Sequence, residues 1–503
     1  MNIRRNKQVS LGGEAIRLTG SKLITLIITM LTTMLLSRFR TFEEYGTYSQ
    51  LLLVINLITT LLMLGLPNSI NYFLARADTK EERKRFLSVY YTLSTVLSII
   101  IGIVLVLSIP LIEGYFHNSL ISNFYYFLAL YPWGSIISSS IENVLVVYKK
   151  TSFLMVYRLA FSIVSLGAVA VVQWLGLGFT EYMIAFVGTQ TFFAISVYII
   201  ASKLSGGIKI SIDSALIKAI FAFSIPIGLA SVVGTLNTEI DKLFIGLLMD
   251  TEQMAIYTNA AKELPLTIVA SSITAVLLPQ LTRMIKKDKT EDAIRLWGFA
   301  TELAFIVICL IVAGLFTYAD EVMTILYSAK YLPGVPVFRI YTLNLVLRVT
   351  YFGIILNAFG ETKKIFCCSV VSLILNAVLN PIFYWIFGMT GPAIATFLAI
   401  LLIQLLQLKM TSNVTKLSFS KIFPWKSTGI LILLNTIFAV VFWVIKKILP
   451  VENYVGEVIE SVILGIIWAG LYFFIMRRRL LDRWHRLNSV GIPKNDKDDC
   501  EMD

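Results

Sequence analysis

The sequence predicts an all-α polytopic membrane protein with about fourteen transmembrane helices. Hydrophobic residues make up 57% of the 503 residues and charged residues only 15%, whereas soluble domains have about 45–50% apolar and 25% charged residues. In addition, many apolar segments reach the length of about 20 residues that a helix needs to cross a bilayer. These two observations exclude a soluble globular protein.

The apolar segments follow one another with short loops between them. We expect spans 1–6 to form an N-terminal lobe (residues 1–215) and spans 7–12 a second lobe (216–412). Helices 13 and 14 are appended (413–479), and a polar tail follows (480–503). The spans lie roughly at 18–37, 46–73, 86–109, 121–147, 153–175, 181–202, 220–247, 256–281, 297–318, 338–359, 365–388, 391–410, 428–447 and 457–476.

The basic residues orient these helices. With fourteen spans, alternate loops collect 31 of the 43 Lys and Arg on one face, five on the other, and seven within spans. Lys and Arg are concentrated in cytoplasmic loops of membrane proteins, so we expect both termini to be cytoplasmic. The same rule explains the net charge of +12 without a nucleic-acid partner. The basic N-terminus has no apolar core followed by a cleavage site, so we interpret it as uncleaved.

Two short stretches recur at nearly the same offset. FEEYGTYSQ (42–50) aligns with TEQMAIYTN (251–259) at a shift of 209, and GFTEYMIA (178–185) aligns with GMTGPAIA (388–395) at a shift of 210. They indicate that spans 1–6 and 7–12 are parallel repeats. Transporters built from such repeats place the substrate between the halves and rock one half against the other.

Several stretches also resemble a known family. LLSRFRTFEEYGTYSQ, LGLPNSINYFLAR, EIDKLFIGLLMDTEQMAIYTNAAKEL, GETKK and LNAVLNPIFYWIFGMTGPAIAT are similar to helices of Wzx-type flippases, the bacterial polysaccharide and oligosaccharide exporters. These belong to the multidrug/oligosaccharidyl-lipid/polysaccharide exporter superfamily. The likeness covers most of the first twelve spans.

The resemblance implies a flippase in the bacterial cytoplasmic membrane. It would turn an undecaprenyl-diphosphate-linked oligosaccharide between leaflets by alternating access, for surface polysaccharide such as O-antigen or exopolysaccharide. The implied partners are this polyprenyl-diphosphate-linked glycan, membrane lipids, a coupling ion (proton or sodium), and a polysaccharide polymerase with its chain-length machinery. No cofactor is expected.

Basic residues within spans are the candidates for binding a diphosphate. Arg348 lies near the middle of a span, where an arginine costs about 2.5–3.5 kcal/mol on insertion scales, and guanidinium suits bidentate phosphate binding. Structural ion pairs and snorkelling to the headgroups are the alternatives. The candidates are Arg17, Lys22, Arg158, Lys242, Lys262 and Arg348.

Acidic residues near or within spans are the candidates for ion coupling. Glu239 stands three residues before Lys242, so the two side chains can neutralise each other on one helix. Asp241 points elsewhere and needs its own partner, for which Lys262 is a candidate. Glu142 lies on the helix before Arg158, and pairing between the two is its alternative role. The full set is Glu142, Glu239, Asp241 and Glu263.

Three other functions compete with this interpretation. A cation-coupled multidrug antiporter of the same superfamily would be expected to carry an acid within the first helix, which here has Arg17 and Lys22 instead. A flippase for the lipid-linked peptidoglycan precursor would share the fourteen helices. A membrane enzyme would need a catalytic outer loop or a ligand cluster, but the chain has only two His and no nucleotide-binding loop, so we expect neither a metal site nor an enzyme.

Overall fold

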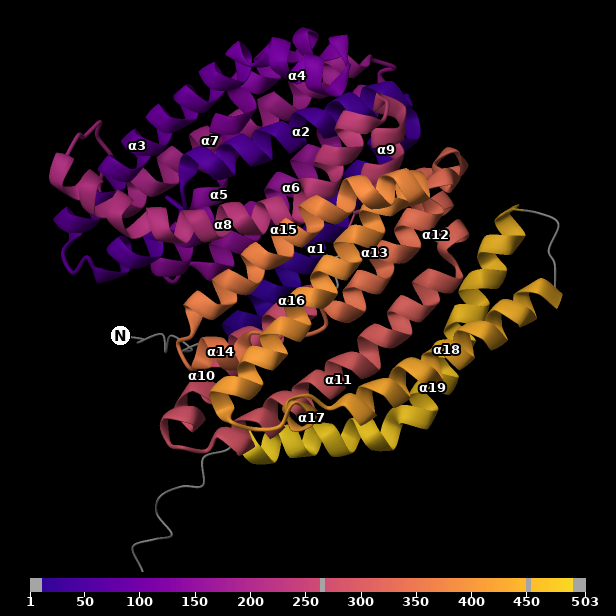
Figure 1. Cartoon of the computed structure of the whole chain (residues 1–503). Helices are drawn as coiled ribbons and strands as arrows, with labels where there is room; N and C mark the ends of the chain where they lie inside the picture. Colours follow the sequence, from indigo (N-terminus) through magenta and orange to yellow (C-terminus); the bar gives the residue numbers. More distant parts are fainter. Residues whose placement is uncertain (1–10, 263–266, 449–453, 492–503) are drawn as a thin grey trace, which may run out of the picture. The chain divides into compact units, whose positions relative to one another are not determined.

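The computed structural model describes residues 11–262, 267–448 and 454–491, and every regular element within these ranges is helical. The contacts group the chain into two units, residues 1–259 and 260–503. Figure 1 shows the helices of both units. The predicted boundaries of the two six-helix lobes, the appended helices and the tail remain predictions.

The first unit contains nine α-helices, one π-helical turn and one 3₁₀ turn within its described residues. They are α1 (Leu11–Phe39), α2 (Phe42–Met63), η1 (Ile70–Leu74), α3 (Lys80–Leu107), α4 (Ile109–Phe116), η2 (Ser119–Phe124), α5 (Tyr125–Val147), α6 (Thr151–Trp174), α7 (Phe179–Ser205), α8 (Ser214–Leu248) and α9 (Thr251–Ala260). Within this unit α1 packs on α6, α5 packs on α3 and α7, and α2 packs on α8.

The second unit begins within the last turn of α9 and is also helical in its described residues. Its elements are α10 (Thr267–Lys286), α11 (Thr290–Thr317), α12 (Ala319–Tyr327), η3 (Ala329–Gly334), α13 (Val335–Leu347), α14 (Ile354–Ala358), α15 (Thr362–Phe387), η4 (Gly388–Thr390), α16 (Gly391–Thr415), α17 (Phe419–Ile422), α18 (Trp425–Ile448) and α19 (Tyr454–Gly491). Here α15 packs on α16, and α11 packs on α10, α13, α18 and α19.

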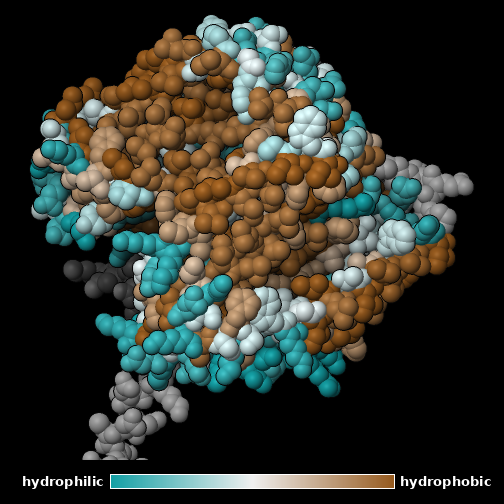
Figure 2. All heavy atoms as spheres, viewed as in Figure 1, coloured by the Kyte–Doolittle hydropathy of each residue, from teal (hydrophilic) through white to brown (hydrophobic). Residues whose placement is uncertain are grey.

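Fourteen of the described helices are at least as long as α13, and each corresponds to one predicted span. Ten stretches of the described chain, one of which covers α15 and α16 together, are long and apolar enough to cross a membrane. Large apolar side chains stand exposed on these helices, among them Trp174, Ile195 and Trp385. Figure 2 shows hydrophobic residues over much of the visible face, with hydrophilic ones gathered near helix ends. The prediction of an all-helical, multi-pass membrane protein is confirmed.

The order of the elements repeats along the chain. In each unit a long helix, α3 or α11, is followed by a short helix, a 3₁₀ turn and another helix. Each element of the second set begins at one constant offset from its counterpart, as the paired first residues show: Lys80 and Thr290, Ile109 and Ala319, Ser119 and Ala329, Tyr125 and Val335. This offset equals the shift of the second sequence match and differs by one residue from that of the first. The repetition therefore extends from short motifs to whole elements.

Local sequence signals explain where several helices begin. Thr41 caps α2: its hydroxyl accepts a hydrogen bond from the Glu44 backbone N–H, and the Glu44 carboxylate accepts one from the Thr41 backbone N–H. Thr79 and Glu82 form the same reciprocal arrangement at the start of α3. Each pair satisfies two of the backbone donors that a helix start leaves free.

Three predicted spans are interrupted in the structure. The span predicted at 46–73 ends as α2 at Met63, because Leu64 and Gly65 adopt positive φ angles of 43° and 73° and Pro67 follows. The span predicted at 256–281 is divided between α9 and α10. The span predicted at 338–359 is divided between α13 and α14, with a non-helical connection at residues 348–353.

Small residues and buried polar groups join the helices within each unit. Gly228 of α8 lies directly against the backbone of Leu64, so α8 crosses the turn after α2 without an intervening side chain. Between α15 and α16, the Ser372 hydroxyl donates to the Ala399 carbonyl at 3.0 Å, and within α15 the Asn380 amide donates to Asn376 Oδ1 at 2.8 Å. Small residues and hydrogen-bonded polar side chains are typical of helix contacts in membranes.

Candidate functional site

Arg158 and Glu142 line a small polar cavity in the first unit. Glu142 lies near the end of α5 and Arg158 lies two turns into α6, and their side chains form an ion pair. The Arg158 side chain is 16% exposed, whereas that of Glu142 is 50% exposed. The cavity has a volume of about 230 Å³, and its other polar lining residues are Thr25, Ser135, Ser138, Ser139, Tyr157 and Gln190. The structure thus brings these two predicted residues together as a pair.

Most of the residues that line a second cavity in the same unit carry a hydroxyl or amide group. Its volume is about 150 Å³, and α1, α2, α5, α6 and α7 all contribute. The ring of Tyr48 stacks on that of Phe186, with 5.2 Å between ring centres. Gln190 lines both cavities. The polar residues are Thr29, Thr32, Thr33, Tyr48, Tyr131, Ser162, Ser165, Thr189 and Gln190. Such a surface offers donors and acceptors to sugar hydroxyls.

The charged residues of α8 form two separate contacts. Lys242 Nζ lies 2.7 Å from Glu239 Oε2, as the three-residue spacing predicted, and the Asn56 amide donates to Glu239 Oε1 at 3.5 Å. Asp241 is fully buried and accepts a hydrogen bond from the Tyr257 hydroxyl at 2.6 Å. The sequence did not indicate Tyr257 as its partner. Because the aspartate and the tyrosine belong to different helices, this contact cannot be predicted from residue spacing along one helix.

For three of the remaining predicted site residues and for Lys262, the structure gives little beyond the exposure of the side chain. Lys22 is exposed on α1, and the side chain of Arg17 on the same helix lies outside the described residues, as does Glu263. Lys262 is partly buried at the start of the second unit, and its pairing with Asp241 remains a prediction.

Arg348 does not occupy the middle of a helix. It is the C-cap of α13, with φ −101° and ψ 14°, and it is partly buried. A cation at this position faces the free carbonyls and negative dipole end of the helix, which stabilise it. The expectation of a mid-helix arginine is therefore corrected, because α13 ends at Leu347 and the next residues connect it to α14.

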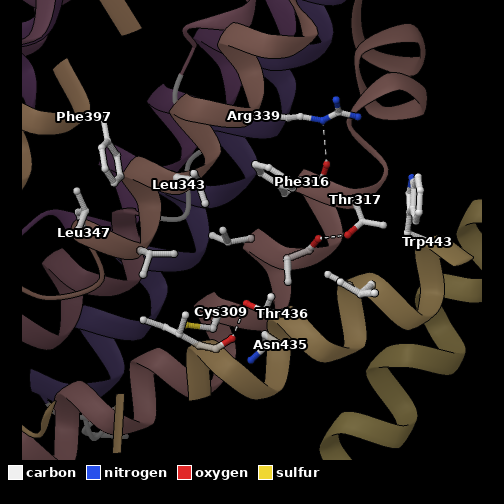
Figure 3. Close-up of a pocket in the computed structure, with 16 residues that line it drawn as sticks. Cys309, Phe316, Thr317, Arg339, Leu343, Leu347, Phe397, Asn435, Thr436 and Trp443 are labelled. Atoms are coloured by element: carbon white, nitrogen blue, oxygen red, sulfur yellow. Dashed lines mark hydrogen bonds between the residues drawn. The ribbon is translucent and has the colours of Figure 1, made fainter. Parts of the chain in front are cut away.

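The second unit holds a large apolar cavity that the sequence did not indicate. Its volume is about 730 Å³, and Figure 3 shows residues of α11, α13, α16 and α18 around it. Arg339 stands at one end, where its Nη2 lies 2.7 Å from Asp320 Oδ2 and its Nε donates to the Phe316 carbonyl. Most of the lining is apolar, including Val312, Phe316, Leu343, Val346, Leu347, Phe397, Ile432, Ala439, Val440 and Trp443. Each of these residues alone resembles an ordinary lipid-facing position.

Another charged cluster joins α11 to α19. Glu302 of α11 is nearly buried, and its carboxylate lies 2.6 Å from Arg479 Nε and 2.9 Å from Arg483 Nε. Glu302 is not among the site residues predicted from the sequence. The high cost of an ionisable group in an apolar span was a signal that could have identified it.

A family model described as "Polysaccharide biosynthesis protein" matches residues 35–336, which is more than half of the chain. The chain belongs to this family. The match begins near the end of α1 and reaches the start of α13, so it includes the Arg158–Glu142 pair and the charged part of α8.

Two curated proteins are similar to parts of the chain. A probable low-salt glycan biosynthesis flippase, Agl15 of Haloferax volcanii, is 21% identical over 226 residues, or 44% of this chain and 48% of that protein. The capsular polysaccharide biosynthesis protein CapF of Staphylococcus aureus is 26% identical over 140 residues, or 27% and 33%. The chain thus spans about half or less of the length of these relatives.

Solved structures share the fold at low sequence identity. The lipid II flippase MurJ in an inward closed conformation superposes with a TM-score of 0.68 at 16% identity, covering 92% of this chain and 99% of that one. An inward-facing multidrug resistance transporter of the MATE family gives a TM-score of 0.62 at 16% identity, covering 80% and 99%. The protein therefore has the fold of these flippases and transporters.

Proposed function

We propose that this protein is a flippase that moves an undecaprenyl-diphosphate-linked oligosaccharide across the cytoplasmic membrane for surface polysaccharide biosynthesis. The observation that carries the proposal is the match to the polysaccharide biosynthesis family over residues 35–336. The names of the two curated relatives, a glycan biosynthesis flippase and a capsular polysaccharide protein, support it. The fold shared with a lipid II flippase is consistent with this activity.

Each unit, taken by itself, offers chemistry that one part of such a substrate would need. The hydroxyl-lined cavity of the first unit offers hydrogen bonds to sugars. The cavity beside it presents the Arg158 guanidinium, and arginine binds phosphate oxygens in a bidentate manner. The apolar cavity of the second unit has exposed Val440 and Trp443 in its wall and suits a polyprenyl chain.

Transport would proceed by alternating access coupled to a proton or sodium gradient. Glu142, Glu239 and Asp241 are the described candidates for the coupling carboxylate, and Glu263 is a further candidate from the sequence. Glu142 and Glu239 are each paired with a cation, so binding of a phosphate by that cation would release a carboxylate to accept an ion. This exchange provides a direct link between substrate and ion.

A deletion strain tests the proposal. We expect lipid-linked oligosaccharide to accumulate on the cytoplasmic face and surface polymer to disappear, and a plasmid copy of the gene to restore both. Normal polymer with new sensitivity to cationic drugs would instead establish a multidrug antiporter, and loss of viability with accumulated peptidoglycan precursor would establish a lipid II flippase. Terminal reporter fusions test the proposed cytoplasmic location of both ends.

The site is tested separately in the complemented strain. Arg158→Ala and Arg348→Ala are expected to reduce surface polymer at normal protein levels, whereas Arg283→Ala, which replaces an exposed arginine near the end of α10, should leave it unchanged. Full export by the Arg158→Ala and Arg348→Ala variants would remove these residues from the substrate site without affecting the proposed activity.

A further inference from the structure

A basic cavity in the second unit lies apart from the cavities described above. Its volume is about 560 Å³, and it is formed by the start of α11, by α17 with its link to α18, and by the C-terminal part of α19. In Figure 2, hydrophilic side chains gather along the edge where Figure 1 places α17 and this part of α19. The lining residues are Ile294, Arg295, Gly298, Phe299, Glu302, Ser420, Lys421, Ile422, Phe423, Pro424, Trp425, Lys426, Ser427 and Arg483.

The charges of this cavity are not balanced. Four cations line it, and the single carboxylate is Glu302, which already binds both Arg479 and Arg483. Arg295 has only a distant contact, 3.9 Å from Asp292 Oδ1. Lys421 and Lys426 form no ion pair with any residue that the structure describes. The cavity therefore keeps an excess of positive charge that an anion would neutralise.

Apolar and aromatic groups stand beside these cations. The Arg483 guanidinium lies 5.3 Å from the centre of the Phe299 ring, and the half-exposed Trp425 donates its indole N–H to the Phe419 carbonyl. Exposed apolar residues continue along the neighbouring helices, with Ile430 and Leu433 on α18 and Leu481 on α19. Aromatic residues next to basic ones mark the boundary between bilayer and water, so this cavity suits an amphipathic ligand.

We infer that the cavity binds the headgroup of an anionic phospholipid. The phosphate would lie against Lys421, Lys426 and Arg295, close to the start of α18, where backbone N–H groups favour an anion. The acyl chains would cover the exposed apolar faces of α18 and α19. Basic pockets between helices on the cytoplasmic side of membrane proteins bind such headgroups, and the cavity is formed by chain segments assigned to the cytoplasmic face from their basic residues.

Native mass spectrometry of the purified full-length protein tests this inference. We expect phosphatidylglycerol to bind more tightly than phosphatidylcholine. A Lys421→Ala/Lys426→Ala double variant should bind phosphatidylglycerol about 30-fold more weakly, because each lysine near an anionic headgroup contributes roughly a fivefold change. The matched control is Lys286→Ala/Lys287→Ala, two exposed lysines at the end of α10, which should keep the affinity of the original protein.

Three results would overturn the inference. They are equal binding of the two lipids, equal loss in both double variants, and full displacement of the lipid by millimolar inorganic phosphate, which would indicate a site for free phosphate. The assay contains no glycan, so its outcome is independent of the proposed flippase activity. Conversely, normal polysaccharide export after deletion of the gene would overturn the proposed flippase activity but would not contradict the lipid site.

Discussion

Glu302 lies on the apolar helix α11. Two arginines of α19 balance the charge of its carboxylate. Its side chain is only 4% exposed, and those of Arg479 and Arg483 are 27% and 22% exposed. Removing one partner of a buried ion pair leaves the others with an uncompensated charge and typically costs about 3–5 kcal/mol. The contact therefore matters more to stability than the exposed ion pairs on the loops, which contribute about 0–1 kcal/mol.

This contact leads to a stability prediction. Glu302→Gln is expected to lower the thermal unfolding temperature in detergent markedly, with a loss of about 2–4 kcal/mol because the arginines remain partly solvated. Glu291→Gln, on the exposed first turn of the same helix, should have no measurable effect. Equal unfolding temperatures for the two variants would contradict a structural role for the Glu302 cluster.

The buried contact between Tyr257 and Asp241 leads to a second prediction. Tyr257→Phe keeps the ring but removes the hydroxyl that donates to Asp241 at 2.6 Å, and removing the partner of a buried acceptor costs about 1–3 kcal/mol. We expect reduced stability in a denaturant titration, whereas Tyr125→Phe at an exposed position should behave as the original protein does. No difference between the variants would show that the bond contributes nothing.

Single residues were predictable from the sequence where spacing along one helix carried the signal. Glu239 and Lys242 form the pair that their three-residue separation allowed, and Glu142 and Arg158 were close enough on successive helices to be considered together. Contacts across long separations were not predictable. Glu302 and Arg479 are 177 residues apart, and the apolar cavity around Val312 and Leu343 forms only when four helices meet.

At the scale of elements, the crossing of α8 and the turn after α2 leads to a third prediction. A methyl group on Gly228 would meet the Leu64 backbone, whereas Gly234 on the same helix has no atom near the corresponding position. Gly228→Ala should lower the free energy of unfolding by about 1–3 kcal/mol, because the added methyl group overpacks the contact. Gly234→Ala should be neutral or slightly stabilising, since alanine favours helix. Comparable yields and unfolding temperatures for both variants would refute this close approach.

The start of α8 leads to a prediction about pH. The Leu216 backbone N–H donates to Asp213 at 3.1 Å, and Arg85 Nε donates to it at 2.7 Å. These contacts hold the pKa of the Asp213 carboxyl below its usual value. A lowered folded pKa stabilises the protein above the unfolded pKa of about 3.9, and this stabilisation is lost as the pH falls through the lowered value.

Asp213→Asn tests this linkage because asparagine can still cap the helix. The stability difference from the original protein should be constant between about pH 5 and 7 and should shrink as the pH falls below about 4. Glu81→Gln, on the exposed first turn of α3, serves as the control. If the stability difference between Asp213→Asn and the original protein stayed constant down to about pH 2, the Asp213 carboxylate would not be the source of the pH-dependent stabilisation.

The existence of the long helices followed from composition and length, but their interruptions did not. Residues 64–70 and 348–353 each contain several apolar residues and have apolar residues on both sides, so a length criterion merges each helix with its neighbour. The first break coincides with positive φ angles at Leu64 and Gly65. At the second connection the Trp297 indole donates to the Thr350 hydroxyl at 2.9 Å, a contact between distant residues that the sequence does not indicate. Arg348 was misplaced for this reason.

For the whole molecule, the sequence predicted the repetition but not which helices pack together. The two short sequence matches, with their nearly equal shifts, anticipated the repeated order of elements. In the structure, however, α8 packs on α2 within the first unit, although the repeat assigns it to the second lobe. Short sequence matches are enough to indicate that the chain is duplicated. Which helices pack together depends instead on local fits such as that between Gly228 and the turn at Gly65.

The ion pair between Glu302 and Arg479 also has a consequence for the biogenesis of the protein. A ribosome that adds about 5–20 residues per second needs roughly 9–35 s to make the 177 residues between them. During that interval Glu302 stands on a newly inserted helix without its final counter-charges. A nascent chain that stops before α19 never acquires them, so an unfinished copy keeps an uncompensated carboxylate on an apolar helix, which is costly in a membrane.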